Sequence, residues 1–361
     1  MKEIYKSLFH DIFQKLIVIS VFLIPCFYWP NHEPRLMKFI CFQVTVNILL
    51  ALSFLFTPKR TIDSFYPALF LILGFINLLL HGMSDFVNVG VSFLLMSVVA
   101  IYIISNHLHI DYVPVIKKTI VLLCLVNCVL FLLEVHGISP IFNLGEHERP
   151  SGFMCYPATF ALLCGISLFL AYDWHRWMML PIGLCLFLSH EFSVIGGVLV
   201  AFVMTSIPYM WRFKWFYVAL ALIGAVISYH WWPLMHDKAM LRMKYLYPVF
   251  QNVWARPIDG AGVGMYNRLP DTFFGFPRGN WSEMHCEPLD LLFCMGFLGV
   301  AVVAGWVRSV WSMSLFYKQI FAIIIITSCF HSPLHFADSL FLIIVIYALM
   351  EIERHEQPTA H

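Results

Sequence analysis

Long apolar stretches alternate with short breaks of charged residues, proline or glycine along the whole chain. A helix needs about 20 mostly apolar residues to cross a hydrocarbon core about 30 Å thick. The pattern therefore predicts an all-α, polytopic membrane protein with about twelve transmembrane helices. The stretches lie at about residues 15–30, 37–56, 66–81, 86–105, 116–136, 153–172, 177–189, 191–210, 214–231, 288–308, 319–330 and 336–350. The stretches 177–189 and 319–330 are short, and either could be tilted, re-entrant or buried behind its neighbours.

Composition supports this class and excludes three others. Apolar residues make up 60% of the chain and charged residues 12%, against about 45–50% and about 25% in soluble domains. A soluble globule and a disordered chain are therefore excluded. The net charge of +1 lacks the basic surplus of a nucleic-acid-binding protein. We expect residues 1–361 to form one transmembrane domain whose partner is the lipid bilayer, and the cysteines to be buried, reduced thiols.

The basic residues predict an orientation, because short cytoplasmic loops carry an excess of Lys and Arg. With both termini in the cytoplasm, only Arg35, Lys38 and Arg149 fall on short outer segments. Six others lie in a long outer loop at about 232–287. The remaining basic residues lie inside: Lys2, Lys6, Lys15, Lys59, Arg60, Lys117, Lys118, Arg176, Arg212, Lys214, Arg308, Lys318 and Arg354.

Other ionisable side chains concentrate on the predicted outer side. Because such groups are costly beside hydrocarbon, they are the first candidates for function. We infer an outward-facing polar cavity, in which arginines can hold a diphosphate and a histidine can accept a hydroxyl proton, without a metal or cofactor. The residues are Glu146, His147, Glu148, Arg149, His190, Glu191, Arg242, Lys244, Arg256, His285, Glu287, His331, His335 and Asp338.

Four spaced blocks between about 145 and 300 resemble the O-antigen ligase and O-antigen polymerase superfamily of bacterial membrane glycosyltransferases. The blocks are Arg149-Pro-Ser-Gly152-Phe-Met-Cys-Tyr-Pro157, Ser189-His190-Glu191, Arg242 fifteen residues before Pro257-Ile-Asp-Gly260-Ala-Gly262-Val-Gly264-Met-Tyr266, and His285-Cys-Glu-Pro continuing to Gly296-Phe-Leu-Gly299. The chain departs from the family twice. It has Ser189-His190-Glu191 in place of Ser-Arg-Gly, and His285-Cys286 in place of His-Asn.

The resemblance implies a GT-C-like glycosyltransferase of lipopolysaccharide biosynthesis in the bacterial inner membrane, with its active face in the periplasm. It would move a glycan from undecaprenyl diphosphate to a hydroxyl of lipid A-core or of another glycan, with inversion and without a metal. His285 would be the catalytic base, and Arg149, Arg242 and Arg256 would bind the diphosphate. The remaining expected substrate-binding residues are His190, Glu287 and His331.

Other interpretations stay open at the level of sequence. His190 and Glu191 would equally cap a helix. His331 and His335 have a metal-ligand spacing, but Pro333 between them disfavours a regular helical site. The whole chain could be a transporter or flippase of lipid-linked sugars, or an inactive relative that binds glycolipid. Ligase, polymerase and protein glycosylation share the same blocks, and the sequence does not decide the oligomeric state.

Overall fold

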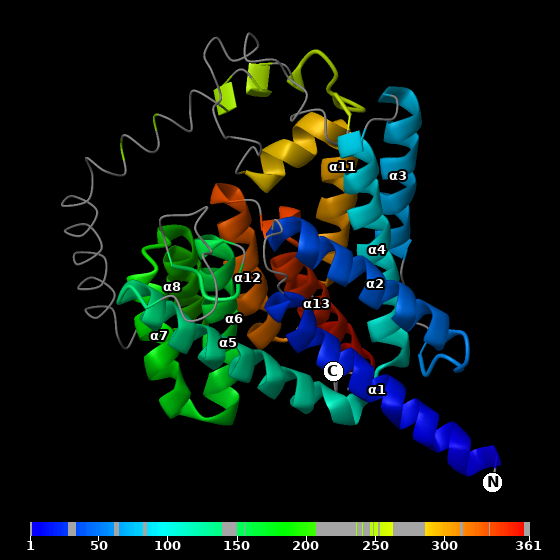
Figure 1. Cartoon of the computed structure of the whole chain (residues 1–361). Helices are drawn as coiled ribbons and strands as arrows, with labels where there is room; N and C mark the ends of the chain where they lie inside the picture. The colour runs from blue at the N-terminus through cyan, green and yellow to red at the C-terminus, as the bar shows by residue number, and fades with distance from the viewer. Residues whose placement is uncertain are drawn as a thin grey trace.

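The structure is a computed structural model that describes residues 2–27, 34–60, 65–81, 85–138, 150–154, 156–206, 236, 240, 246–247, 249–251, 253–262, 286–310, 313–331 and 333–356. In this part of the chain every regular element is a helix, as the apolar pattern predicts (Figure 1). The helices are α1 (Lys2–Cys26), α2 (Pro34–Ser53), α3 (Phe65–His81), α4 (Asp85–His107), η1 (Ile110–Tyr112), α5 (Val113–Val135), α6 (Pro157–Trp174), η2 (Arg176–Met178), α7 (Met179–Leu188), α8 (Phe192–Ser206), α11 (Glu287–Val310), α12 (Leu315–Phe330), η5 (Pro333–His335) and α13 (Ala337–Glu356).

Each apolar stretch in the described ranges corresponds to a helix. The predicted stretch at 214–231 and most of the predicted outer loop at 232–287 lie outside those ranges. The short stretch 177–189 forms the ten-residue α7 after the turn η2. The other short stretch begins earlier than predicted, because α12 starts at Leu315 and has 16 residues.

Several helices are suited to a membrane. In the described chain, five segments are long and apolar enough to cross one, namely Leu8–Cys26, Leu36–Ser53, Ile110–Val135, Pro157–Trp174 and Glu287–Ser309. Shorter apolar helices accompany them. Large apolar side chains such as Ile72, Leu180 and Phe187 are exposed on the helix surfaces. In water such surfaces would be aggregation-prone, whereas a bilayer covers them. The helices thus indicate membrane association, and twelve crossings and their orientation stay predictions.

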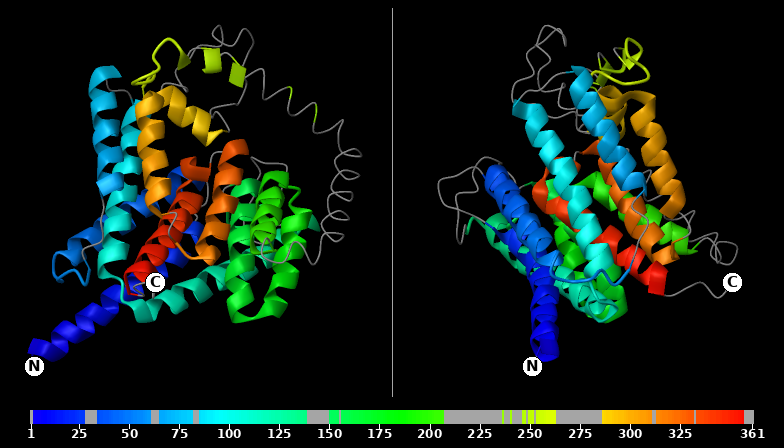
Figure 2. Two further views of the ribbon diagram at one scale, coloured as in Figure 1. Left: turned by 180° about the vertical axis from the view of Figure 1, so that it is seen from behind. Right: turned by 90° about the vertical axis from the view of Figure 1, so that its right-hand side faces the viewer.

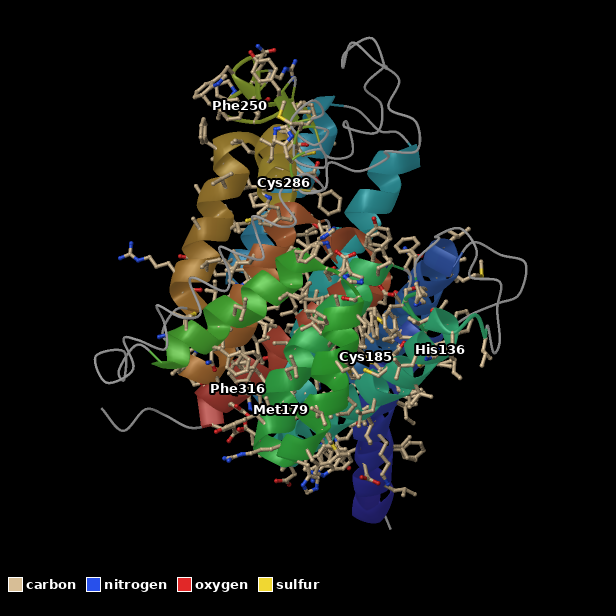
Figure 3. The ribbon with its side chains drawn as sticks, turned by 90° about the vertical axis from the view of Figure 1, so that its left-hand side faces the viewer. His136, Met179, Cys185, Phe250, Cys286 and Phe316 are labelled. Atoms are coloured by element: carbon tan, nitrogen blue, oxygen red, sulfur yellow. The ribbon has the colours of Figure 1, made fainter. Side chains whose placement is uncertain are left out.

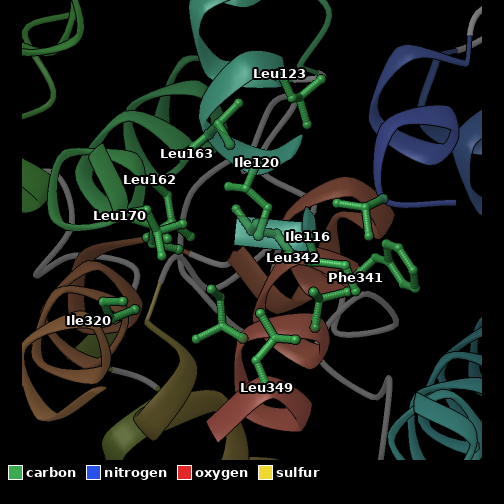
Figure 4. Close-up of a cluster of buried hydrophobic side chains, with 14 of the residues drawn as sticks. Ile116, Ile120, Leu123, Leu162, Leu163, Leu170, Ile320, Phe341, Leu342 and Leu349 are labelled. Atoms are coloured by element: carbon green, nitrogen blue, oxygen red, sulfur yellow. The ribbon is translucent and has the colours of Figure 1, made fainter. Parts of the chain in front are cut away.

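Helix α13 is the central helix of the bundle. It packs against α1, α2, α4 and α6, and most of its residues are buried. Figure 4 shows Phe341, Leu342 and Leu349 of α13 facing apolar side chains of α5, α6 and α12. Its charged residues lie near its two ends, with Asp338 at the start and Glu351 in the last turns. This helix therefore connects the two ends of the bundle (Figure 2).

Helices α8 and α12 approach each other closely, and this contact sets the position of the site. A Cβ at Gly197 would lie 3.0 Å from the Cα of Ile323. Small residues allow such close helix contacts in membranes. The two helices pack along their lengths. Glu191, just before α8, can therefore contact His331, just after α12.

Candidate functional site

Six helix ends meet on one side of the bundle and bring polar side chains together. They are the starts of α2, α6, α8, α11 and α13 and the end of α12, and direct contacts connect them as described below. We call this region the polar end. The residues that define it are Lys38, Tyr156, Glu191, Glu287, His331 and Asp338.

A buried histidine–carboxylate pair lies at the polar end. The Nε2 of His331 is 3.0 Å from Oε2 of Glu191, and the two side chains are 12% and 5% exposed. If Nε2 carries a hydrogen, it donates to the carboxylate, and Nδ1 of a neutral ring is then a proton acceptor. Within the described ranges this buried Nδ1 has no hydrogen-bond partner. The carboxylate thus fixes the ring, as in other oriented imidazoles used for proton transfer.

The block that precedes α6 reaches the same histidine. The ring of Tyr156 lies 6.5 Å from the ring of His331, edge to face, and stacks on Phe336 at 5.5 Å. Aromatic pairs at these separations attract beyond their burial alone. The turn between α12 and α13 is therefore in contact with the residue that opens α6.

The block that opens α11 contacts the same turn. The backbone N–H of Leu334 donates to Oε1 of Glu287 at 2.9 Å. Glu287 is the first residue of α11, and Leu334 is three residues after His331 in the sequence. This bond therefore holds the start of α11 against the turn that follows His331. Cys286, just before α11, lies toward the same end of the molecule as Phe250 in Figure 3, and burial raises the pKa of its thiol.

Side chains of α5 hold the turn before α6 through hydrogen bonds. Backbone N–H groups of Ser151 and Gly152 donate to Oε2 of Glu134 at 2.9 and 3.0 Å, and that of Phe153 donates to Oδ1 of Asn127 at 2.8 Å. Gly152 has φ +60°, and a Cβ there would lie 2.9 Å from the Asn127 amide oxygen. The glycine of this block is therefore required by a left-handed turn in close contact with α5.

A fully buried ion pair connects α2 with the start of α13. Nζ of Lys38 is 3.0 Å from Oδ2 of Asp338, and the side chains are 2% and 0% exposed. The ammonium also donates to the carbonyl oxygen of Phe153, and Oδ1 of Asp338 accepts from the N–H of Ser339. These added bonds satisfy charges whose isolation would be costly. The pair thereby ties the turn before α6 to α13.

The segment that begins Pro257-Ile-Asp-Gly260, which we call the Pro-Gly block, lies against a break in α11. Gly296 has φ +63° and interrupts the helix. N–H groups of Phe297 and Ala261 donate to the carbonyl oxygens of Pro257 and Phe293 at 2.8 and 2.7 Å. A Cβ at Gly296 would lie 2.3 Å from the carbonyl oxygen of Ile258. The two glycine-rich segments are therefore in direct backbone contact.

Helix α3 completes this contact. The amide of Asn77 donates to the carbonyl oxygens of Asp259 and Cys294, at 2.7 and 3.0 Å. Gly260 has φ +72°, and a Cβ there would lie 2.5 Å from the carbonyl carbon of Cys294. One buried side chain therefore holds both partners of the Pro-Gly contact.

The predicted site residues divide into two groups. His285, Arg149 and Arg242 lie outside the described residues, as does the side chain of His335. Of the others, the structure joins Glu287 and His331 to one turn. His190 is exposed with φ +55°, and Arg256 is exposed just before the Pro-Gly block. A cavity of about 10 Å³ beside Asp338 is mostly apolar and too small for a sugar, so the larger polar cavity stays a prediction.

Three contributors were not predicted as site residues. The sequence places Lys38 only on an outer segment, and Asn127 and Glu134 fall inside the apolar stretch 116–136. A signal existed for each, because a charged or amide side chain inside an apolar stretch needs a buried partner. The partners are mostly backbone groups, which carry no signal in the sequence.

No protein-family model matches the chain, and no curated protein matches it.

Proposed function

We propose that the chain is a glycosyltransferase similar to O-antigen ligases and polymerases, and that it works at the polar end. One observation carries the proposal. Three of the four motif blocks contact the turn between α12 and α13, through Tyr156, Glu191 and Glu287. The blocks are far apart in sequence, and a purely structural role would not require three of them to meet at one turn.

In the proposed reaction, an acceptor hydroxyl oxygen attacks the anomeric carbon of the donor glycan. The bond from that carbon to the diphosphate oxygen breaks, and undecaprenyl diphosphate leaves with the electron pair. His285 accepts the hydroxyl proton, while Arg149, Arg242 and Arg256 offset the charge that develops on the leaving group. Attack opposite the leaving group inverts the anomeric configuration.

The histidine–carboxylate pair would support this reaction rather than replace His285. With Glu191 holding Nε2, His331 would contact the substrate from a fixed position. His190 and Glu287 would complete the substrate contacts. The acceptor would be lipid A-core or another glycan, reached from the periplasmic face of the inner membrane, in the orientation that the basic residues predict.

A transfer assay tests the proposal. The full chain, reconstituted in vesicles, is given an undecaprenyl-diphosphate-linked glycan and candidate acceptors. We expect a glycosylated acceptor with wild type and loss of at least about a hundredfold in rate with His285→Ala. His175→Ala is the matched control, because this exposed histidine follows α6 at the opposite end of the bundle, and it should keep wild-type activity.

The result that overturns the proposal is also specific. Donor that crosses the bilayer chemically unchanged, with no acceptor product, would instead identify a transporter or flippase. Equal product formation by wild type and His285→Ala would show that His285 is not the catalytic base.

A further inference from the structure

Four of the ten cysteines converge in the interior between α5, α6 and α7. The sulfur atoms of Cys124, Cys128 and Cys164 all lie within 4.8 Å of one another. Cys185 of α7 borders them, with its sulfur 3.8 Å from the carbonyl oxygen of Cys128. All four side chains are at most 2% exposed. Figure 3 shows Cys185 between the end that carries Cys286 and the end that carries Phe316.

The sulfur spacing suits a metal ion. Three sulfurs around an ion at about 2.3 Å lie about 4 Å apart, and Sγ of Cys124 lies 3.8 Å from Sγ of Cys164. Cys124 and Cys128 are one helical turn apart on α5, and Cys164 faces them from α6. Little movement is therefore needed to place one ion between the three sulfurs.

A neighbouring polar group borders the sulfurs. The hydroxyl of Ser167 lies against the Cys124 thiol, and Ser167 is fully buried. Ser167 is three residues after Cys164 on the same helix, so it faces the same space.

We propose that Cys124, Cys128 and Cys164 form a binding site for Cu(I). Sulfur ligands select soft ions, chiefly Cu(I) and Zn(II). Zn(II) requires a fourth ligand, whereas Cu(I) is satisfied by three sulfurs, and Cys185 is directed to a backbone carbonyl. Cysteine binds a metal as the thiolate, so binding of Cu(I) to the three sulfurs releases three thiol protons to solvent and gives a complex of net charge −2.

Copper titration of the purified full chain tests the site. The protein is reduced without oxygen and titrated with Cu(I) from its bicinchoninate complex. We expect one Cu(I) per chain in wild type, with X-ray absorption showing sulfur ligands alone. The double variant Cys124→Ala/Cys164→Ala should bind at least about tenfold more weakly. Cys41→Ala removes a buried thiol from α2, outside the cluster, and should bind like wild type.

Three outcomes would overturn the site. They are equal copper retention by wild type and the double variant, nitrogen or oxygen ligands in the absorption spectrum, and binding of Zn(II) in preference to Cu(I) when both ions are supplied. Because the absorption spectrum is read on wild type, misfolding of a variant does not prevent a decision. The result is independent of the proposed transferase reaction.

Discussion

The two ends of the helix bundle both carry ion pairs, but in different surroundings. At the end opposite the polar end, Arg60 pairs with Glu356 at 2.5 Å, Lys117 pairs with Glu353 at 2.7 Å, and Arg354 is 3.2 Å from Glu351. We call this the anchor end. In each pair there at least one side chain is 27% exposed or more. At the polar end, the ion pairs of Lys38 and of Glu191 are at most 12% exposed.

The difference in exposure changes what the charges do. Exposed pairs contribute about 0–1 kcal/mol and mainly hold helix ends in place. At the anchor end Lys117 also lies over the ring of Phe316, at 5.0 Å, which suits a membrane interface. The anchor end also holds buried single partners, Arg60 and Glu351. At the polar end both partners of each pair are 12% exposed or less. Such pairs are expensive to keep, so their retention favours a functional reason.

Breaking the buried ion pair should have the largest effect. Lys38→Met leaves the carboxylate of Asp338 buried without its charge partner, and we expect a loss of about 3–5 kcal/mol in the free energy of unfolding. Lys117→Met at the anchor end should lose at most about 1 kcal/mol. Denaturation in detergent, followed by the change in tryptophan fluorescence, measures both. The double variant Lys38→Met/Asp338→Asn should recover part of the loss, and equal losses at the two ends would contradict the contrast.

The backbone contact at Gly296 should be nearly as sensitive. Gly296→Ala places a Cβ 2.3 Å from the Ile258 carbonyl oxygen and on a left-handed residue. We expect a loss of about 2–4 kcal/mol, because crowding and backbone strain add. Gly196→Ala is the matched control, since nothing lies within 4 Å of a Cβ at this helical position. Thermal unfolding of both variants gives the comparison. An unchanged unfolding temperature for Gly296→Ala would show that the Pro-Gly block does not pack against the break in α11.

Removing the charge of Glu191 should have an intermediate effect. Glu191→Gln weakens the bond to His331, and we expect a loss of about 1–2 kcal/mol together with a slower transfer reaction. Glu353→Gln changes an equivalent carboxylate whose pair is more exposed, and it should change stability by about 0.5 kcal/mol or less. Unfolding curves and the transfer assay are read on both variants. A Glu191→Gln protein with wild-type stability and rate would show that the pair is dispensable.

The sequence predicts helices better than it predicts contacts between them. Apolar length gives α2 and α11 within a few residues, because hydrophobicity is a local property. The roles of Glu134 and Asn127 were missed, since their partners are backbone N–H groups of a distant turn. His331 was predicted as a substrate contact, but its pairing with Glu191 depends on how α8 packs against α12. Such packing is set by shape, which one sequence does not reveal.

The smallest effect concerns the thiol at the start of α11. Burial raises the pKa of Cys286 above its ordinary value of 9.0, so less thiolate is present at neutral pH than in a free thiol. Because the thiolate is the reactive form, alkylation should be slower than for a free thiol at pH 7 and should still accelerate above pH 9. In oriented vesicles, a membrane-impermeant maleimide should reach Cys286 from the periplasmic side, and loss of that labelling in Cys286→Ser identifies the site. Labelling from the cytoplasmic side alone would place the polar end on the wrong face and reverse the predicted orientation.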